Sequence, residues 1–302
     1  MQSIPGEART FAIYSERFIL VPPRQIGISS SRGNANFLKA LSLYLSSDFV
    51  KYHQFLTSPS FGVKREISTL RALKSLPVPF AANGDLSSWI GLHGKITRVS
   101  AQDNPDPQEL TVLMVELNEL TNVALKLDDR SVAIVRDFVH VRMSLQDGKR
   151  GTPAVKTPTP PELETYAARL KSELDSFLGE SSPERHTVRI VCSTDFGIVR
   201  IDVEPQHARG SKTQVLVATD EMARELRMMR SLLRERQSQW IYFNRNLRIY
   251  EGTTTYIAKP MQRLHWLESQ AMLDANEIIA ETLEPASSNE RSESLHAYGH
   301  IR

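Results

Sequence analysis

Apolar residues in the first half of the chain recur at helical spacing. From Asn36 to Thr57 they fall every three or four residues, which predicts one amphipathic helix. A shorter helix is predicted over residues 67–76, where two nearby prolines end it. The stripes at 110–124 and 132–139 predict two more helices that pack against each other. We therefore expect this half of the chain to be rich in helix.

The segments between these helices carry other patterns. Residues 17–28 predict two short strands separated by a Pro-Pro pair. Residues 57–65 contain proline, glycine and serine, which favour a loop. The polar, glycine-containing residues 81–108 predict a long connector.

The region around residues 149–161 holds four prolines and is predicted to be a linker. Thr159 and Glu162 form a capping-box pattern that opens a helix running to Phe177. From residue 285 the chain is rich in serine and glutamate, a composition typical of disorder. The predicted organisation is a domain at 1–148, the linker at 149–161, a domain at 162–284 and a tail at 285–302.

In the second domain the apolar period changes to two. Val188–Cys192 and Ile198–Val203 alternate across a short turn, which predicts a β-hairpin. Further strands are predicted at 214–218, 240–243, 247–250 and 254–257, and helices at 222–233 and 264–279. The predicted fold class is α+β, with a helix-rich first half, a short strand pair in it, and then small antiparallel sheets with packed helices.

Composition excludes several classes of protein. Hydrophobic residues make up 40% and charged residues 24% of the 302 residues, which is typical of a globular chain and excludes collagen, coiled coils and wholly disordered proteins. No apolar stretch is long enough for a membrane helix, and the first residues lack a signal-peptide pattern. We expect a cytoplasmic protein without a membrane partner. The single cysteine excludes an internal disulfide framework and a cysteine-rich zinc site.

The net charge of +2 conceals alternating blocks of charge. Residues 1–80 carry a net charge of +6 and residues 224–263 also +6, whereas residues 81–223 and 264–302 each carry −5. Basic zones of this size suit a polyanion, because phosphate contacts supply most non-specific affinity for nucleic acids. Solvated helix faces explain the same pattern, so both interpretations stay open.

No catalytic constellation is visible. The triplet Asp195-Phe196-Gly197 matches a kinase motif, but the other kinase motifs are missing and it lies at a predicted hairpin turn. Asp202 and Glu204 share a strand face, as in some metal nucleases, without the lysine that would complete such a site. No histidine pairs with another histidine or a cysteine at the spacing of metal ligands. We therefore expect neither a catalytic nor a metal site.

Two segments favour contact with nucleic acid. The first spans residues 18–79, where polar side chains between short elements have the chemistry to reach phosphates or base edges. The second is the run from Trp240 to Trp266, in which aromatic residues alternate with basic ones and suit base stacking. Ordinary loop polarity and a half-buried strand core are the respective alternatives. The candidate DNA-contacting residues are Arg24, Gln25, Lys64, Arg65, Arg71, Lys74, Arg245, Arg248, Lys259 and Arg263.

Both segments resemble the C-terminal, target-recognition part of N6-adenine DNA methyltransferases from restriction-modification and phage-defence systems. In that family a strand with a Pro-Arg turn precedes a helix like LKALSLYLSSDFVKYHQFL at 38–56. A Ser/Gly loop then leads into a closure that is matched here by Leu73, Leu76, Pro77 and Pro79. The segment 247–281, LRIYEGTTTYIAKPMQRLHWLESQAMLDANEIIAE, is similar to the end of a subset of these enzymes.

The resemblance implies a DNA-recognition portion that positions double-stranded DNA for a methyltransferase catalytic chain. The family's catalytic domain carries a Gly-rich methyl-donor loop and an (Asn/Asp)-Pro-Pro-(Tyr/Phe) motif. Here the Pro-Pro pairs follow Val21 and Thr159, neither of which is an Asn or Asp. No catalytic residue is carried over, and S-adenosylmethionine is expected only in the partner, as for a truncated or split gene.

Two alternatives remain. One is a protein-interaction subunit whose paired helices at 110–145 and acidic middle block dock a partner without nucleic acid. The other is an enzyme with a site that no known motif reveals.

Overall fold

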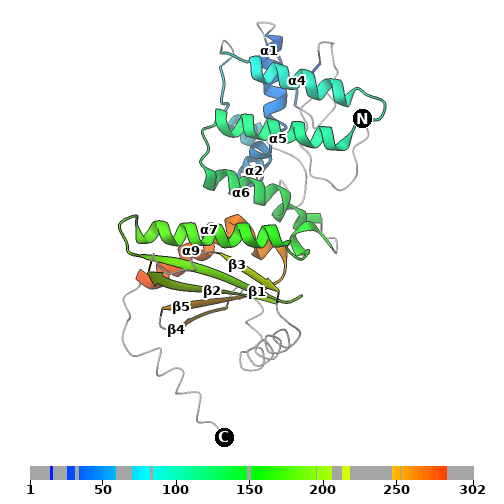
Figure 1. Cartoon of the computed structure of the whole chain (residues 1–302). Helices are drawn as coiled ribbons and strands as arrows, with labels where there is room; N and C mark the ends of the chain where they lie inside the picture. The colour runs from blue at the N-terminus through cyan, green and yellow to red at the C-terminus, as the bar shows by residue number, and fades with distance from the viewer. Residues whose placement is uncertain are drawn as a thin grey trace. The chain divides into compact units, whose positions relative to one another are not determined.

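The computed structural model describes residues 14–15, 26–30, 34–58, 70–81, 84–147, 151–194, 196–205, 213–217, 247–251 and 253–283. The chain divides into two compact units, Met1–Ala154 and Val155–Arg302. Figure 1 shows the helices and strands of these two units. The division falls inside residues 149–161, the segment predicted to be a linker.

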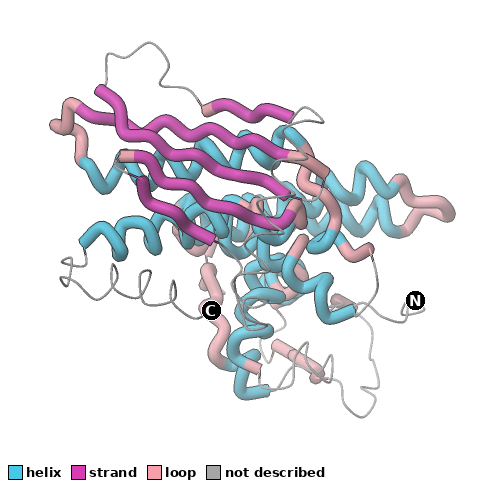
Figure 2. Tube along the Cα trace, turned by 90° about the horizontal axis from the view of Figure 1, so that it is seen from below, coloured by secondary structure: helices cyan, strands magenta, loops and turns pink. Residues whose placement is uncertain are grey.

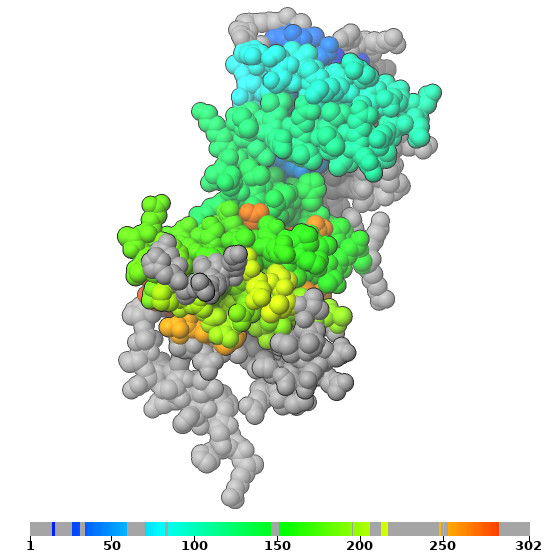
Figure 3. Space-filling view, viewed as in Figure 1, coloured from blue at the N-terminus to red at the C-terminus, as the bar shows by residue number. Residues whose placement is uncertain are grey.

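The described part of the N-terminal unit consists of helices joined by turns and irregular segments. Of the strand pair predicted at residues 17–28, only 26–28 are described, and they are irregular. In the space-filling view, α4 and α5 lie at the surface (Figure 3). The helices are α1 (Ala35–Tyr44), α2 (Asp48–Thr57), α3 (Leu70–Lys74), α4 (Ser87–Ser100), α5 (Pro107–Ala124), α6 (Asp129–His140), and the 3-10 segments η1 (Arg142–Asp147) and η2 (Pro153–Val155), the last of which spans the division between the units.

The helix predicted as continuous over residues 36–57 is interrupted after Tyr44. The backbone N–H groups of Ser46 and Ser47 donate to the carbonyls of Leu43 and Tyr44, which closes the first helix with tight turns. The Ser47 hydroxyl then accepts from the Val50 N–H at 3.4 Å and caps α2. The prediction of a single helix was wrong, because apolar spacing continues across the break while the capping serine starts a new helix.

The predicted connector at 81–108 contains a full helix, α4. Trp89, Leu92 and Val99 of this helix are buried, and they lie on one face. Gly91 and Gly94 suggested a loop, but the space around both Cα atoms is open, so they interrupt no packing. Burial of the apolar face outweighs the helix cost of about 1 kcal/mol for each glycine.

A common core joins α1, α2, α4 and α5. Tyr44 and Leu117 are fully buried in it, and Trp89 contacts Phe80 with ring centroids 5.0 Å apart. The Tyr44 hydroxyl donates to the carbonyl of Pro77 at 2.5 Å. This bond attaches the irregular chain after α3 to the core.

The C-terminal unit is a five-stranded sheet with helices against it. Figure 2 shows the strands side by side in the order β3-β1-β2-β5-β4. The β1–β3 pair is parallel, and the other neighbours are antiparallel. The elements are α7 (Pro160–Leu178), β1 (Glu184–Cys192), β2 (Phe196–Pro205), β3 (Gln214–Val217), β4 (Leu247–Glu251), β5 (Thr254–Pro260), the 3-10 segment η4 (Arg263–His265) and α9 (Glu268–Leu283).

The α+β prediction is confirmed, and the sheet is mixed where a purely antiparallel one was expected. The hairpin at 188–203 and the strands at 214–218, 247–250 and 254–257 are present. The predicted helix at 222–233, the strand at 240–243 and the tail lie outside the described residues. The last helix begins at Glu268, because residues 263–265 form the separate segment η4.

Alternation along the strands creates two distinct faces. Val188, Ile190, Val199, Ile201 and Ile257 point to one face and are buried there with apolar residues of α7 and α9. Figure 1 shows both helices on that same side of the sheet. We call this the inner face; the side chains between these positions form the outer face.

Candidate nucleic-acid interface

The predicted DNA-contacting residues have very different environments. Five of them lie outside the described residues: Arg24, Gln25, Lys64, Arg65 and Arg245. The others divide into an exposed pair on α3 and three residues of the C-terminal unit that bind acidic side chains.

Arg71 and Lys74 are the exposed pair. Both are on α3, three residues apart, so they are neighbours on one side of the helix. Ala72 between them is buried, which orients the helix against the core. Within the part of the chain that the structure describes, neither cation has an ion-pair partner. The pair is therefore available to an anion.

Arg248 of β4 lies against α9 instead. Its guanidinium forms ion pairs with Glu277 and with Glu281, the latter at 2.8 Å, and its side chain is only 14% exposed. The Tyr250 hydroxyl also donates to Glu281. Burial, together with this carboxylate, raises the pKa of Tyr250 to about 12. The charge of Arg248 is thus balanced within the unit.

Lys259 of β5 is fully buried. Its ammonium group donates to Asp274 of α9, to the Tyr166 hydroxyl at 2.7 Å and to the His265 carbonyl at 3.1 Å. Burial lowers the pKa of Lys259 to about 8, against the opposing effect of Asp274. A predicted contact between Lys259 and DNA is incompatible with this position, because every donor direction of the ammonium is already used inside the core.

Arg263 is partly exposed and has an internal partner. Its Nε donates to Glu162 at 2.5 Å, and the same carboxylate accepts from the Thr159 N–H at 2.9 Å. Glu162 therefore completes the predicted capping of α7 and also holds η4. Burial raises the pKa of Glu162, but the bonds from Thr159 and Arg263 outweigh it and lower that pKa overall.

The outer face of the sheet carries polar residues that the sequence analysis did not select. In the register of the sheet, Gln214 of β3 is level with Arg189 of β1, Arg189 with Arg200 of β2, and Arg200 with Tyr256 of β5. We call these four residues the outer row. Their strand positions alternate with buried or partly buried ones, so strand periodicity would have revealed each, but only the register aligns them.

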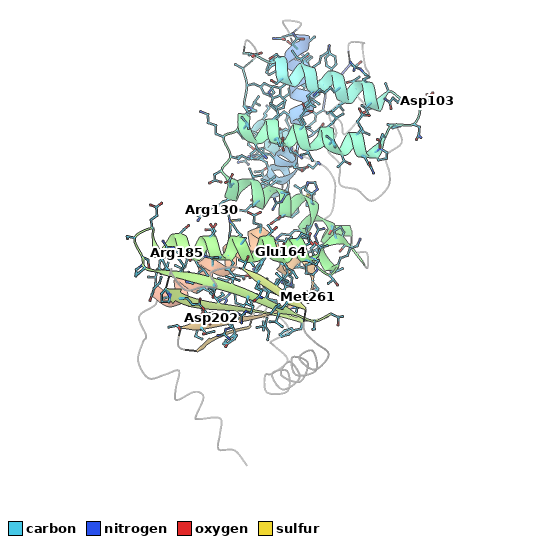
Figure 4. All side chains as sticks on the ribbon, in the orientation of Figure 1. Asp103, Arg130, Glu164, Arg185, Asp202 and Met261 are labelled. Carbon is cyan, nitrogen blue, oxygen red and sulfur yellow. The ribbon has the colours of Figure 1, made fainter. Side chains whose placement is uncertain are left out.

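Arg200 is fixed within the outer row. Its guanidinium donates through Nε to Asp202 at 2.8 Å, and lies 6.0 Å from the centroid of the Tyr256 ring. Figure 4 labels Asp202 on β2. Thr254 also donates to Asp202 at 2.7 Å. This carboxylate has two firm partners, which does not suit the nuclease role considered for Asp202 and Glu204.

Arg189 differs from Arg200. It is exposed, and within the described chain it makes no hydrogen bond or ion pair. It lies directly opposite Arg200, an arrangement in which like charges repel. An anion between the two guanidinium groups would relieve that repulsion.

The remaining chemical candidates have structural explanations. Gly197 of the kinase-like triplet has no room for a side chain, because an added Cβ would lie 2.6 Å from the Trp266 ring. His186 contacts Asp175 through Nδ1 at 3.0 Å beside a shallow depression that Lys171 and Arg185 also line. Among the described residues, no group of His, Cys, Asp and Glu could hold a metal ion, and no helix could cross a membrane.

Comparisons with protein-family models, with curated proteins and with solved structures gave no match to this chain.

Proposed function

We propose that this chain is the DNA-recognition portion or subunit of an N6-adenine DNA methyltransferase of a restriction-modification or related defence system. The observation that carries the proposal is the α3 cation pair. Arg71 and Lys74 are exposed, have no ion-pair partner among the described residues, and lie inside the first segment that resembles the family. The chain next to them is anchored by the bond from Tyr44 to Pro77.

The α3 pair acts on the phosphate backbone. Two neighbouring cations on one helix face bind adjacent phosphates and release the counterions that those phosphates hold. Such contacts set the position of a protein on a duplex, whereas base contacts specify the sequence. The α3 pair therefore positions the protein on the duplex, and other residues recognise the DNA sequence.

The methyl transfer belongs to a partner chain. An adenine must be extruded from the duplex into a pocket before its amino group reacts. The motif that grips the base and the donor-binding loop are missing from this sequence. S-adenosylmethionine would accordingly bind to the partner, and this chain would hold the DNA.

An electrophoretic titration of the full chain against duplex DNA tests the proposal. Binding should weaken steeply between about 50 and 200 mM salt. Replacing both Arg71 and Lys74 by alanine should weaken binding and reduce the salt slope by about 2, since each phosphate contact contributes about 0.9.

A matched control is available on α4. Lys95 and Arg98 have the same spacing and are also exposed, and Lys95 pairs with Glu116 at 2.9 Å. Replacing both by alanine removes the same charge outside the resembling segment. Equal losses in the two double variants would reject the α3 pair as the docking site. Absence of duplex binding, with and without a methyltransferase chain, would reject the proposed function.

A second candidate function is a protein-interaction subunit, and α5 supplies the observation in its favour. Val112, Val115 and Val123 are 66%, 52% and 77% exposed and lie along one side of this helix. Glu116 and Glu119 lie on the same side by helical spacing. Exposed apolar residues gathered on one face mark interaction sites.

Co-purification distinguishes the two functions. A Val115→Asp variant should lose a retained protein partner if α5 is the docking face. A chain that keeps its partner in wild-type form but never binds nucleic acid would favour the interaction function over DNA recognition.

A further inference from the structure

We propose that the outer row binds a single-stranded segment of DNA across the sheet. The site consists of Gln214, Arg189, Arg200 and Tyr256, one residue from each of four adjacent strands. It is separate from the α3 pair. The choice of DNA over RNA rests on the proposed function, whereas the choice of a single strand rests on the geometry.

The row itself contains two cations and no anion. Arg189 and Arg200 are direct cross-strand partners, and such like-charged pairs destabilise a sheet. Asp202 neutralises Arg200 through both Nε and a terminal nitrogen. Arg189 has an exposed side chain and makes no hydrogen bond or ion pair in the described part of the chain, although its charge contributes to lowering the pKa of Asp202. Asp202 is one carboxylate against two cations, so a phosphate group beside Arg189 would balance the second.

The other end of the row suits a base. The Tyr256 ring lies within cation–π distance of the Arg200 guanidinium, 6.0 Å from the ring centroid, and Arg200 is 43% exposed. Both side chains end in a flat group, and Asp202 holds the guanidinium in place. Unstacked bases pack on such aromatic and guanidinium surfaces irrespective of their sequence.

Dimensions favour a single strand over a duplex. Neighbouring strands are about 4.8 Å apart, so four strands span about 14 Å from Gln214 to Tyr256. The major groove is about 12 Å wide and admits a helix or a two-stranded ribbon. A broad sheet does not enter it. A single strand, in contrast, lies flat across a sheet with its bases against the side chains.

Groups beside the row add hydrogen bonds. Thr187 and Thr254 are the register partners of Asp202 on either side, so a second line of polar side chains runs parallel to the row. A threonine hydroxyl can hydrogen-bond to a base edge, whereas the Asp202 carboxylate already accepts from Arg200 and Thr254. It would repel a phosphate, which places the backbone of the strand nearer to Arg189.

Fluorescence anisotropy of the full chain with a labelled single strand of about 12 nucleotides tests the inference. Tyr256→Ala should weaken binding about tenfold, and Tyr256→Phe should keep wild-type affinity because the stacking ring remains. Arg189→Ala should weaken binding at low salt and reduce the salt slope by about 0.7, the value for one phosphate contact on a single strand.

Lys156→Ala is the matched control for Arg189→Ala. Lys156 is exposed in the same unit and lies outside the sheet, so its removal should leave single-strand affinity unchanged. Circular dichroism of each variant establishes that the sheet is intact. The inference is overturned if the wild-type chain binds no single strand, or if Tyr256→Ala and Arg189→Ala bind as well as wild type.

Two further arms separate the inference from the proposed function. An RNA of the same sequence that binds as tightly as the DNA would overturn the choice of DNA. If the chain binds a single strand through the outer row but does not bind duplex DNA, the proposed function is refuted and this site is supported. If the chain binds duplex DNA through the α3 pair but binds no single strand, the proposed function is supported and this inference is refuted.

Discussion

Lys259 and Asp274 form an ion pair that is fully removed from water. Burying two charges costs several kcal/mol for each, which the pair recovers only through close contact and additional hydrogen bonds. Those bonds are present here, because the Tyr166 hydroxyl donates to Asp274 at 2.6 Å and Gln270 donates at 3.1 Å. The network connects β5, α7 and α9, so it specifies how the helices sit on the inner face.

Replacing one partner of this pair should lower the free energy of unfolding far more than would be expected from the effect of replacing both. We expect Lys259→Met or Asp274→Leu alone to destabilise the chain by about 3–5 kcal/mol, because a buried charge remains unpaired. The double variant should cost clearly less than the sum of the two. The urea midpoint measures each effect. Lys156→Met, an exposed control, should change stability by less than about 0.5 kcal/mol; strictly additive losses would contradict the pair.

Asp48 has a similar structural role in the N-terminal unit. Its carboxylate accepts from Lys51 at 2.8 Å, from Asn118 at 2.7 Å and is 2.7 Å from the His140 Nε2. Burial by itself raises the pKa of Asp48, but the hydrogen bond from His140 and the charge of Lys51 outweigh it. The resulting pKa is about 2, below the ordinary 3.8. Asp48 therefore joins α2, α5 and α6.

This pKa predicts an acid-sensitive N-terminal unit. A carboxyl group whose pKa is lower in the folded state stabilises the fold above its ordinary pKa, and this contribution disappears as the pH falls through the folded value. The loss should amount to about 2 kcal/mol between about pH 4 and pH 2. Urea midpoints across this window measure it. Asp48→Asn should flatten the dependence, whereas Asp103→Asn, at an exposed site, should retain the wild-type slope.

At the residue scale, sequence alone did not separate exposed cations from internal ones. Lys74 and Lys259 both precede a proline-containing turn and both lie in segments that resemble the methyltransferase family. Lys74 is exposed, and Lys259 is completely buried. The difference comes from Asp274 and Tyr166, which are distant from Lys259 in the chain and reach it only after α7 and α9 have packed on the sheet.

Capping residues decide where the helices begin. Thr159 and Glu162 are spaced as a capping box, and α7 begins at Pro160 as predicted. Asp128 caps α6 through the Ser131 N–H at 2.8 Å. Capping residues of this kind can be recognised in the sequence. The break at Ser47 uses the same chemistry, but the continuous apolar stripe on both sides concealed it.

The capping role of Ser47 is directly testable. Ser47→Ala should destabilise the chain by about 1 kcal/mol, because the Val50 N–H loses its acceptor at a buried site. Ser46→Ala is the control, since the Ser46 hydroxyl donates to a carbonyl within α1 and caps no helix start. The urea midpoint reports both. Equal small losses for the two variants would show that Ser47 does not set the start of α2.

At the scale of the whole molecule, part of the charge alternation is internal pairing. The basic block at 224–263 and the acidic block at 264–302 meet within the C-terminal unit, where Arg248 binds Glu277 and Glu281 and Lys259 binds Asp274. These cations are therefore paired with carboxylates inside the C-terminal unit. The exposed cations that carry the two proposals, the α3 pair and Arg189, come from other blocks.

The sequence by itself determined the α+β class, the hairpin and most helix positions, because these depend on local apolar periods and on caps. Tertiary structure alone decided which charges face solvent. It buried Lys259, paired Arg248 and Arg263 with carboxylates, and aligned Arg189 with Arg200 and Tyr256 on one face. The physical reason is that exposure and cross-strand register depend on contacts between residues far apart in the chain, and no local pattern records them.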